Sequence, residues 1–250
     1  MNYPNIFRTL LFNLRAFGLR RGLKLPVYVY SRVKVYNMGH LIIKTPITKG
    51  MIRIGLLESN SAVPYTIWNN KGSIEFEGNV WINHGTRIKN SGTIVFHGNN
   101  ILGYEVQLDI IEHLEIGNNT TIGFCSEVTD NDSHYIVDIN TREIKPNRKP
   151  IILGNFNWIT SHSYIRKGTI TPDFIIVASP NSVLRKDYRG EIEPYTTLAG
   201  NPLHAIGAGK LRVYNFDSEK ILNNALVGEG KPSVYVLPKD IDLVKFCAFK

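Results

Sequence analysis

The sequence predicts an all-β fold, a parallel β-helix in which each coil contains three short strands. A six-residue period of aliphatic residues runs through the second half of the chain, and Gly, Ser and Thr recur at fixed places within it. Six is a poor period for an α-helix and is longer than the alternation of one strand. It suits a chain that makes a short strand, turns a corner and repeats.

The six-residue period begins at residue 110 and resumes after one interruption. Its positions are Ile110, Ile116, Ile122 and Val128, and then Leu153, Ile159, Ile165, Thr171, Val177 and Val183. Three hexapeptides close a triangular coil, so residues eighteen apart stack at roughly 4.8 Å, the spacing of neighbouring strands. We therefore expect Ile159 to lie over Val177, and Ile165 over Val183. A β-sandwich, the alternative, predicts a period of two.

Before residue 110 the same pattern is looser. Further strands are indicated by Ile52, Ile54, Ile74, Phe76, Val80, Ile82, Ile88 and Ile94. We expect a β-helix domain of seven or eight coils over residues 51–207, with imperfect coils at its N-terminal end because terminal repeats are atypical. Residues 1–50 would then form a basic, partly helical cap.

The last segment, residues 208–250, is predicted as a C-terminal extension with one short helix. Asp217 to Val227 has a helical pattern, with Asp217 as N-cap and Gly228 beyond the end. The tail from Lys231 is expected to pack back on the chain or to contact a neighbouring subunit.

Positive charge is concentrated near the amino terminus. The formal net charge is +8, and residues 1–50 contain nine Lys or Arg and no Asp or Glu. Arginines lie between apolar residues from Ile6 to Phe17, which predicts an amphipathic helix packed on the body of the protein. Contact with an anionic membrane surface and binding of nucleic acid are the alternatives, and we predict no nucleic-acid partner.

The sequence favours a cytoplasmic location, with the inner face of the membrane as an alternative. No apolar run approaches the ~18 residues of a membrane span, and arginines interrupt the apolar start, unlike in a signal peptide. The two cysteines, Cys125 and Cys247, fit neither a disulfide framework nor a metal-ligand spacing. No bound metal is predicted.

The interruption of the repeat at residues 135–152 is the main functional indication, because insertions in repeat proteins form loops, commonly on the binding face. His134 directly precedes it, with Asp130 and Asp132 at alternate positions before the histidine. A histidine oriented by a carboxylate is the arrangement of a general base. The competing interpretation is an Asp- and Asn-rich turn with an incidental histidine.

Four motifs together resemble the hexapeptide-repeat acetyltransferases, and within them the sugar O-acetyltransferases. They are the stretch 152–162 (Ile-Leu-Gly-Asn-Phe-Asn-Trp-Ile-Thr-Ser-His), Arg166-Lys167-Gly168, the stretch 181–187, and Ala199-Gly200-Asn201-Pro202. The resemblance covers residues 110–207, and more weakly residues 40–109. It implies a left-handed parallel β-helix, a homotrimer with active sites between subunits, and acetyl-CoA as co-substrate.

The same resemblance implies roles for individual residues. His134 matches the family's catalytic base, and Asp132 and Asp130 would orient it or bind the acceptor. The cofactor-binding positions are Trp158 near the acyl-CoA arm, Ser161 and Ser179 at the pantetheine, and Arg185 and Lys186 near the adenosine and its phosphates.

Structural roles compete with these assignments. Trp158 can be a corner-filling aromatic, and Arg185 and Lys186 can be a solvated edge. His162 fits a structural role or a place near the pantetheine better than that of a second base. The segments 171–174 and 178–180 depart from the family's pattern, as does Leu203-His204, where many relatives have a basic residue.

The predicted function is therefore an acetyl-CoA-dependent O-acetyltransferase that acts on a hydroxyl of a sugar or surface-polysaccharide precursor, with a histidine general base. One alternative is an N-acyltransferase acting on an aminosugar. The other is a β-helical scaffold without catalytic activity.

Overall fold

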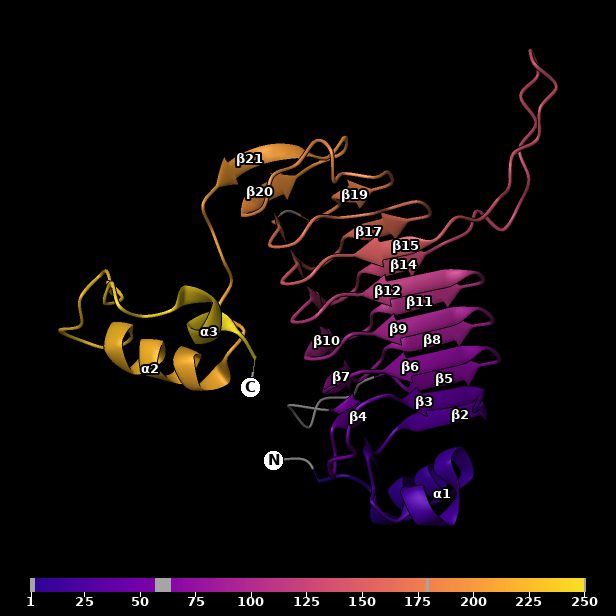
Figure 1. Cartoon of the computed structure of the whole chain (residues 1–250), viewed down its shortest axis with the longest axis horizontal. Helices are drawn as coiled ribbons and strands as arrows, with labels where there is room; N and C mark the ends of the chain where they lie inside the picture. Colours follow the sequence, from indigo (N-terminus) through magenta and orange to yellow (C-terminus); the bar gives the residue numbers. More distant parts are fainter. Residues whose placement is uncertain (1–2, 57–63, 179, 250) are drawn as a thin grey trace.

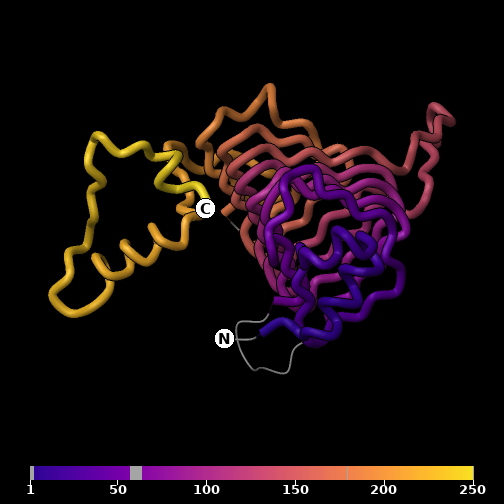
Figure 2. The backbone as a smooth tube through the Cα atoms, turned by 60° about the horizontal axis from the view of Figure 1, so that its bottom comes forward, coloured from indigo at the N-terminus to yellow at the C-terminus, as the bar shows by residue number. Residues whose placement is uncertain are grey.

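The computed structural model describes residues 3–56, 64–178 and 180–249. Three parallel sheets wrap around one core, and the chain visits them in turn, so that strands three apart in the chain are neighbours in a sheet through most of the molecule. Figure 1 shows the stacked coils from the side, and Figure 2 shows them closer to end-on. The three sheets are called A, B and C below.

Each sheet contains one strand of each coil, apart from the C-terminal end. Sheet A contains β1 (Val27–Val29), β4 (Ile52–Leu56), β7 (Val80–Asn83), β10 (Asn100–Leu102), β13 (Thr121–Ile122), β16 (Trp158–Ile159), β18 (Ile176–Val177), β20 (Thr196–Ala199) and β21 (His204–Ala208). Sheet B contains β2 (Val33–Asn37), β5 (Thr66–Asn70), β8 (Arg87–Asn90), β11 (Gln107–Ile110), β14 (Glu127–Thr129), β17 (Tyr164–Arg166) and β19 (Val183–Leu184). Sheet C contains β3 (His40–Ile43), β6 (Ser73–Phe76), β9 (Thr93–Phe96), β12 (His113–Ile116) and β15 (Ile151–Leu153).

The aliphatic residues of the six-residue period fill the core. Ile122, Ile159 and Val177 are fully buried and lie one above the other in sheet A, since Ile122 pairs with Ile159 and Ile159 with Val177. The predicted stacking of Ile159 over Val177 is confirmed. The predicted stacking of Ile165 over Val183 is wrong, because Ile165 pairs with Leu184. Val177 and Leu184, the buried residues of β18 and β19, are seven positions apart instead of six. The pairing of β17 with β19 is therefore shifted by one residue.

The coils between β7 and β14 are longer than three hexapeptides. Ile101 pairs with Trp81, and Thr121 with Ile101, an offset of 20 residues instead of 18. Strands of sheet C supply two inward side chains each, such as Leu114 and Ile116 in β12, both fully buried.

The β-helix begins before the boundary predicted at residue 51. Val27 pairs with Ile52, so β1, β2 and β3 form the first coil. Val27, Val29 and Val33 are buried, which explains why this segment joins the core instead of forming a separate cap. Before it, α1 (Ile6–Gly22) packs on the first coil. No helix among the described residues has the length and apolar character to cross a membrane.

The C-terminal extension leaves the β-helix after β21, which pairs antiparallel with β20. It contains α2 (Phe216–Leu226) and α3 (Leu243–Cys247), and it packs back on sheet A, where the rings of Phe216 and Phe249 contact Trp81. The N-cap of α2 is Asn215, whose side chain accepts hydrogen bonds from the first turn. The prediction of Asp217 as N-cap is thus wrong by two residues.

Candidate active site

A long arm leaves the β-helix between β14 and β15, at the corner between sheets B and C (Figure 1). Its two sides run antiparallel, with bridges at Asn131 and Arg148 and at Val137 and Ile144. At its tip the Asp138 carboxylate accepts hydrogen bonds from the backbone of Thr141 and Asn140, which lower the pKa of Asp138. The insertion predicted at 135–152 overlaps β15, because Ile151 is fully buried in the core.

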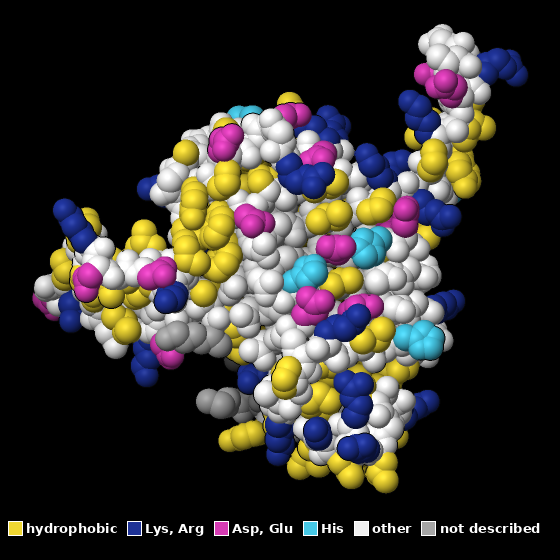
Figure 3. All heavy atoms as spheres, viewed as in Figure 1, with side chains coloured by type: hydrophobic (Ala, Val, Ile, Leu, Met, Phe, Trp, Pro, Cys, Tyr) yellow, Lys and Arg dark blue, Asp and Glu magenta, His cyan; other side chains and the backbone are white. Residues whose placement is uncertain are grey.

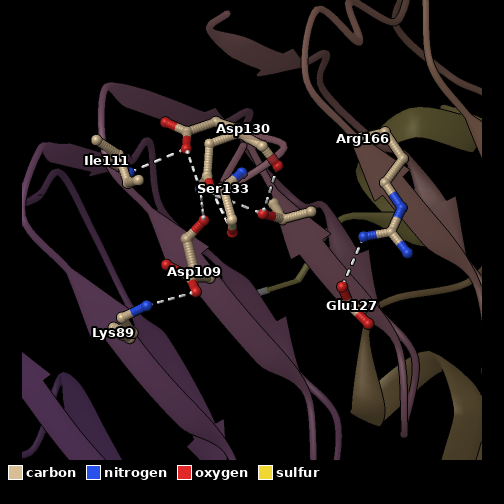
Figure 4. A network of polar contacts seen from close by, with 9 residues as sticks. Lys89, Asp109, Ile111, Glu127, Asp130, Ser133 and Arg166 are labelled. Atoms are coloured by element: carbon tan, nitrogen blue, oxygen red, sulfur yellow. Dashed lines mark hydrogen bonds and ion pairs between the residues drawn. The ribbon is translucent and has the colours of Figure 1, made fainter. Parts of the chain in front are cut away.

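Asp130 is a corner residue at the base of the arm. It is fully buried, and its two carboxylate oxygens accept hydrogen bonds from the backbone N–H groups of Ile111, Glu112 and His113 at 2.9, 2.7 and 2.9 Å. Figure 4 shows the carboxylate turned toward this corner of the preceding coil. With its oxygens engaged there, Asp130 holds the corner, and its expected role of orienting His134 or binding the acceptor stays a prediction.

His134 is exposed, near the base of the arm, and lines a cavity of about 300 Å³, here called the arm pocket. The cavity is bounded by Asp132, His134, Ile136, Asp138, Glu143, Lys145, Pro146, Asn147 and Lys167. Asp132 shares the cavity with His134, but its carboxylate forms an ion pair with Lys167. The structure thus places the predicted base and one predicted carboxylate in the same cavity, with the carboxylate engaged by a lysine.

A larger cavity of about 720 Å³ adjoins the arm pocket and is called the sheet B groove. Its floor is the outer surface of β8, β11, β14 and β17, and its wall is the start of the arm; the cavity is bounded by Arg87, Lys89, Gln107, Leu108, Asp109, Glu127, Thr129, Asn131, Asp132, Ser133, Ile136 and Arg166. Ion pairs connect neighbouring strands across it, Lys89 with Asp109 at 2.8 Å and Arg166 with Glu127 at 2.6 Å (Figure 4). Asp132 and Ile136 line both cavities, so the two adjoin at the arm.

Trp158 lies on sheet A, away from the arm. The guanidinium of Arg212, from the C-terminal extension, lies 4.8 Å from the centre of the indole ring. Both line a cavity of about 460 Å³, the Trp158 pocket. Burial lowers the pKa of Arg212, and its Nη1 is buried with no hydrogen-bond partner among the described residues. A single chain therefore does not bring Trp158 together with His134.

The other predicted cofactor residues are spread along the upper coils. Ser161 follows β16 at the corner toward sheet B, and Ser179 lies outside the described residues. Arg185 and Lys186 follow β19 and are exposed, and Lys186 forms an ion pair with Glu191. His162 lies at the same corner as Ser161, with its ring against Phe124, and lines neither the arm pocket nor the sheet B groove.

A second group of titratable side chains lies on the outer surface of sheet C. His97 contacts Glu77 at 2.7 Å and Glu115 at 3.4 Å, and Glu115 also contacts His113 at 2.8 Å. Burial acts to lower the pKa of His97, but the hydrogen bonds and charges of the two glutamates outweigh it, so the pKa is raised. The hydrogen bond from His113 is the main reason that the pKa of Glu115 is lowered. These groups line neither the arm pocket nor the sheet B groove, and they link three neighbouring strands.

Sequence reasoning did not identify the floor of the sheet B groove. Its side chains occupy the outward positions of the strands, each one residue from a buried aliphatic, as Asp109 is from Leu108 and Ile110. That alternation is visible in the sequence. The 20-residue offset that aligns Lys89 with Asp109 cannot be recognised in the same way, because it depends on the lengths of the sides and corners of the coil.

No protein-family model matches the sequence, and no curated protein matches it. Several solved structures resemble the fold distantly. The polySia specific acetyltransferase NeuO has 17% identity and a TM-score of 0.42 over 86% of this chain and 93% of its own. The polysialic acid O-acetyltransferase OatWY has 17% identity and a TM-score of 0.38 over 79% and 94%. A mutant of AntD, an N-acyltransferase from Bacillus cereus in complex with dTDP and Coenzyme A, has 16% identity and a TM-score of 0.41 over 79% and 86%. Because the identities and TM-scores are this low, the activity of this chain has to be inferred from its own residues.

Proposed function

We propose that this protein is an acetyl-CoA-dependent O-acetyltransferase on a left-handed parallel β-helix, and that it acetylates a hydroxyl of a sugar or surface-polysaccharide precursor. The observation that carries the proposal is the place of His134. Among the described residues it is the only histidine that lines the arm pocket or the sheet B groove. An exposed imidazole beside a polar groove suits a general base, because imidazole gains and loses a proton near neutral pH.

The proposed chemistry requires one proton acceptor from the protein. Bound acetyl-CoA supplies the acetyl group as a thioester. His134 takes the proton of the acceptor hydroxyl as the hydroxyl oxygen bonds to the acetyl carbon and the carbon–sulfur bond breaks; the proton then returns to the departing thiolate. Lys167, which pairs with Asp132, lines the same pocket as His134.

The sheet B groove suits a sugar acceptor. It is large enough for a small oligosaccharide, and its walls offer charged and amide groups in fixed positions. One carboxylate oxygen of Asp109 binds Lys89, while the other, Oδ1, is buried and has no hydrogen-bond partner among the described residues. A hydroxyl donor in the groove would satisfy this oxygen, since unpaired buried acceptors are costly.

The Trp158 pocket suits part of acetyl-CoA. The unpaired Nη1 of Arg212 can donate to a carbonyl or phosphate oxygen in the Trp158 pocket, and the indole ring offers an apolar wall for a flexible chain. Arg185 and Lys186, which follow β19 of sheet B, add exposed positive charge that suits phosphate groups.

We further propose a homotrimer in which each site lies between two subunits. The arm leaves at the corner between sheets B and C, whereas Trp158 lies on sheet A, the opposite side of the triangle. The arm also exposes large apolar side chains, with Ile136 at 73% and Ile139 at 86% exposure. Apolar surface of this kind indicates an interaction site, and sheet A of a second subunit would cover it.

The activity is tested by acetyl-CoA turnover, followed as release of free thiol, with sugars, aminosugars and lipid-linked glycans as acceptors. Wild type is expected to be active, and His134→Ala to lose roughly 10²–10⁴-fold in turnover. His40→Ala, an exposed histidine of β3 that lines none of these cavities, is the matched control and is expected to keep its activity. Equal turnover of wild type and His134→Ala would remove His134 from the mechanism, acetylation of an amine alone would favour the N-acyltransferase, and failure to bind acetyl-CoA would favour the scaffold.

The shared site is tested by mixing two inactive variants. His134→Ala subunits retain Trp158, and Trp158→Ala subunits retain His134. After the two are unfolded and refolded together at equal concentration, about a quarter of the sites of a trimer should contain both native residues. Recovery of activity in the mixture, with none in either variant alone, supports a site between subunits. A mixture as inactive as its components contradicts it.

A further inference from the structure

Helix α1 has apolar side chains on two opposite sides. Its inner side closes the core at the first coil, where Phe12 is 3% exposed and meets Trp68 edge to face at 5.7 Å. Thr9 and Asn13 on the same side are buried and hydrogen-bond to the backbone of β1. This side fixes the helix rigidly on the end of the β-helix.

The outer side of α1 has no packing partner among residues 3–56, 64–178 and 180–249. Ile6 is 83% and Phe7 74% exposed, and Leu10 and Leu11 on the same side are also exposed. Next to them lies a shallow cavity of about 340 Å³ whose lining is mainly apolar, including Phe7, Leu11 and Met38. An exposed apolar surface on an amphipathic helix that is already anchored on its other side indicates a binding surface.

The charged residues in the segment of the chain that forms this surface are all positive. The first 50 residues contain nine Lys or Arg and no Asp or Glu. Arg15, Arg20 and Lys24 are exposed and form no ion pair among the described residues. Figure 3 shows Lys and Arg side chains and apolar side chains gathered at the end of the molecule formed by α1.

We propose that this end of the protein binds the surface of an anionic lipid bilayer, with the outer side of α1 inserted among the headgroups. Apolar side chains interleaved with arginines and lysines match the two components of such a surface, its apolar interior and its negative charge. A second copy of the chain fits poorly, because two such ends would bring the exposed Arg15, Arg20 and Lys24 of each copy together. Nucleic acid would leave Ile6 and Phe7 in water.

Bound in this way, the protein presents its cavities away from the lipid. From β2 beside α1, sheet B contains two strand steps to β8, where the sheet B groove begins, and four to β14 at the base of the arm, about 10 Å and 19 Å at the usual spacing of ~4.8 Å. Both cavities therefore stay open when the opposite end rests on a membrane. Lipid binding and acetyl transfer are separate properties of the molecule and can fail separately.

The proposal is tested by co-sedimentation of the full chain with vesicles of phosphatidylcholine alone and with vesicles containing about 30% phosphatidylserine, the fraction at which a negative surface potential is strong. Binding is expected only to the anionic vesicles and should weaken as salt is raised, since salt screens surface charge. Arg15→Ala with Arg20→Ala should weaken binding about 25-fold, at roughly fivefold for each basic residue. Phe7→Ser with Leu11→Ser should weaken it roughly tenfold or more.

Matched controls separate the surface from general effects. Lys231→Ala with Lys239→Ala removes two exposed charges from the C-terminal extension, and Ile139→Ser removes an exposed apolar side chain from the arm; both should bind vesicles like wild type. Circular dichroism checks that the α1 variants fold. No binding to anionic vesicles, equal binding to both vesicle types, or unchanged binding by folded α1 variants would each overturn the proposal. So would dissociation of an oligomer by Phe7→Ser with Leu11→Ser without any vesicle binding.

Discussion

Replacing Asp130 should unfold the corner at the base of the arm and leave the chemistry of the site intact. In Asp130→Ala, the N–H groups of Ile111, Glu112 and His113 lose their shared acceptor. A hydrogen bond to a charged acceptor contributes about 1.5–3 kcal/mol, and water can reach part of this corner, so we expect a loss of about 3–5 kcal/mol of unfolding free energy. For a chain of this size that corresponds to a fall in Tm of about 6–20 °C.

Two further variants make this prediction specific. Asp130→Asn keeps one acceptor oxygen and should lose about half as much stability as Asp130→Ala. Asp132→Asn removes an exposed ion pair with Lys167 and should change stability by less than about 1 kcal/mol. Unfolding is followed by circular dichroism in urea, and turnover is measured well below each Tm. If Asp130→Asn were as stable as wild type yet lost its turnover, Asp130 would be catalytic and the structural role assigned to it would be wrong.

Three other predictions concern the β-helix and its ends. Gly123→Ala should lower the free energy of unfolding by about 1–3 kcal/mol, because a Cβ there would lie 2.4 Å from the backbone nitrogen of Ser161 in the next coil. In the matched control, Gly190→Ala, the added Cβ has no atom within 4 Å, so urea unfolding should give the same stability as wild type. His97 has a raised pKa, so its stabilising effect is complete below its ordinary value of 6.5 and disappears as the pH rises through the raised value. His97→Gln should therefore lose more stability relative to wild type at about pH 5.5 than at about pH 8.5, and the same loss at both would contradict this reasoning. Phe12→Ala should cost about 3–5 kcal/mol in chemical denaturation if α1 closes the core as described, whereas a change below about 1 kcal/mol would show that it does not.

The sequence by itself determined the kind of fold and the position of the candidate site. The six-residue period is a local property, because each inward aliphatic is buried within its own short strand, and it predicted the stacking of Ile159 over Val177. The interruption of the period identified the arm, with His134 at its beginning. Both features can be recognised without knowing which residues meet in space.

Only the tertiary structure decided which residues of neighbouring coils lie next to one another. The offset between coils is 20 residues in the middle of the chain and 18 between β16 and β18, depending on the length of the sides and corners. That offset places Asp130 against the corner formed by residues 111–113 and aligns Lys89 with Asp109. The tertiary structure also distinguishes the two apolar sides of α1, because the first coil covers Phe12 and leaves Phe7 exposed. Packing, and not composition, selects which side of a helix is buried.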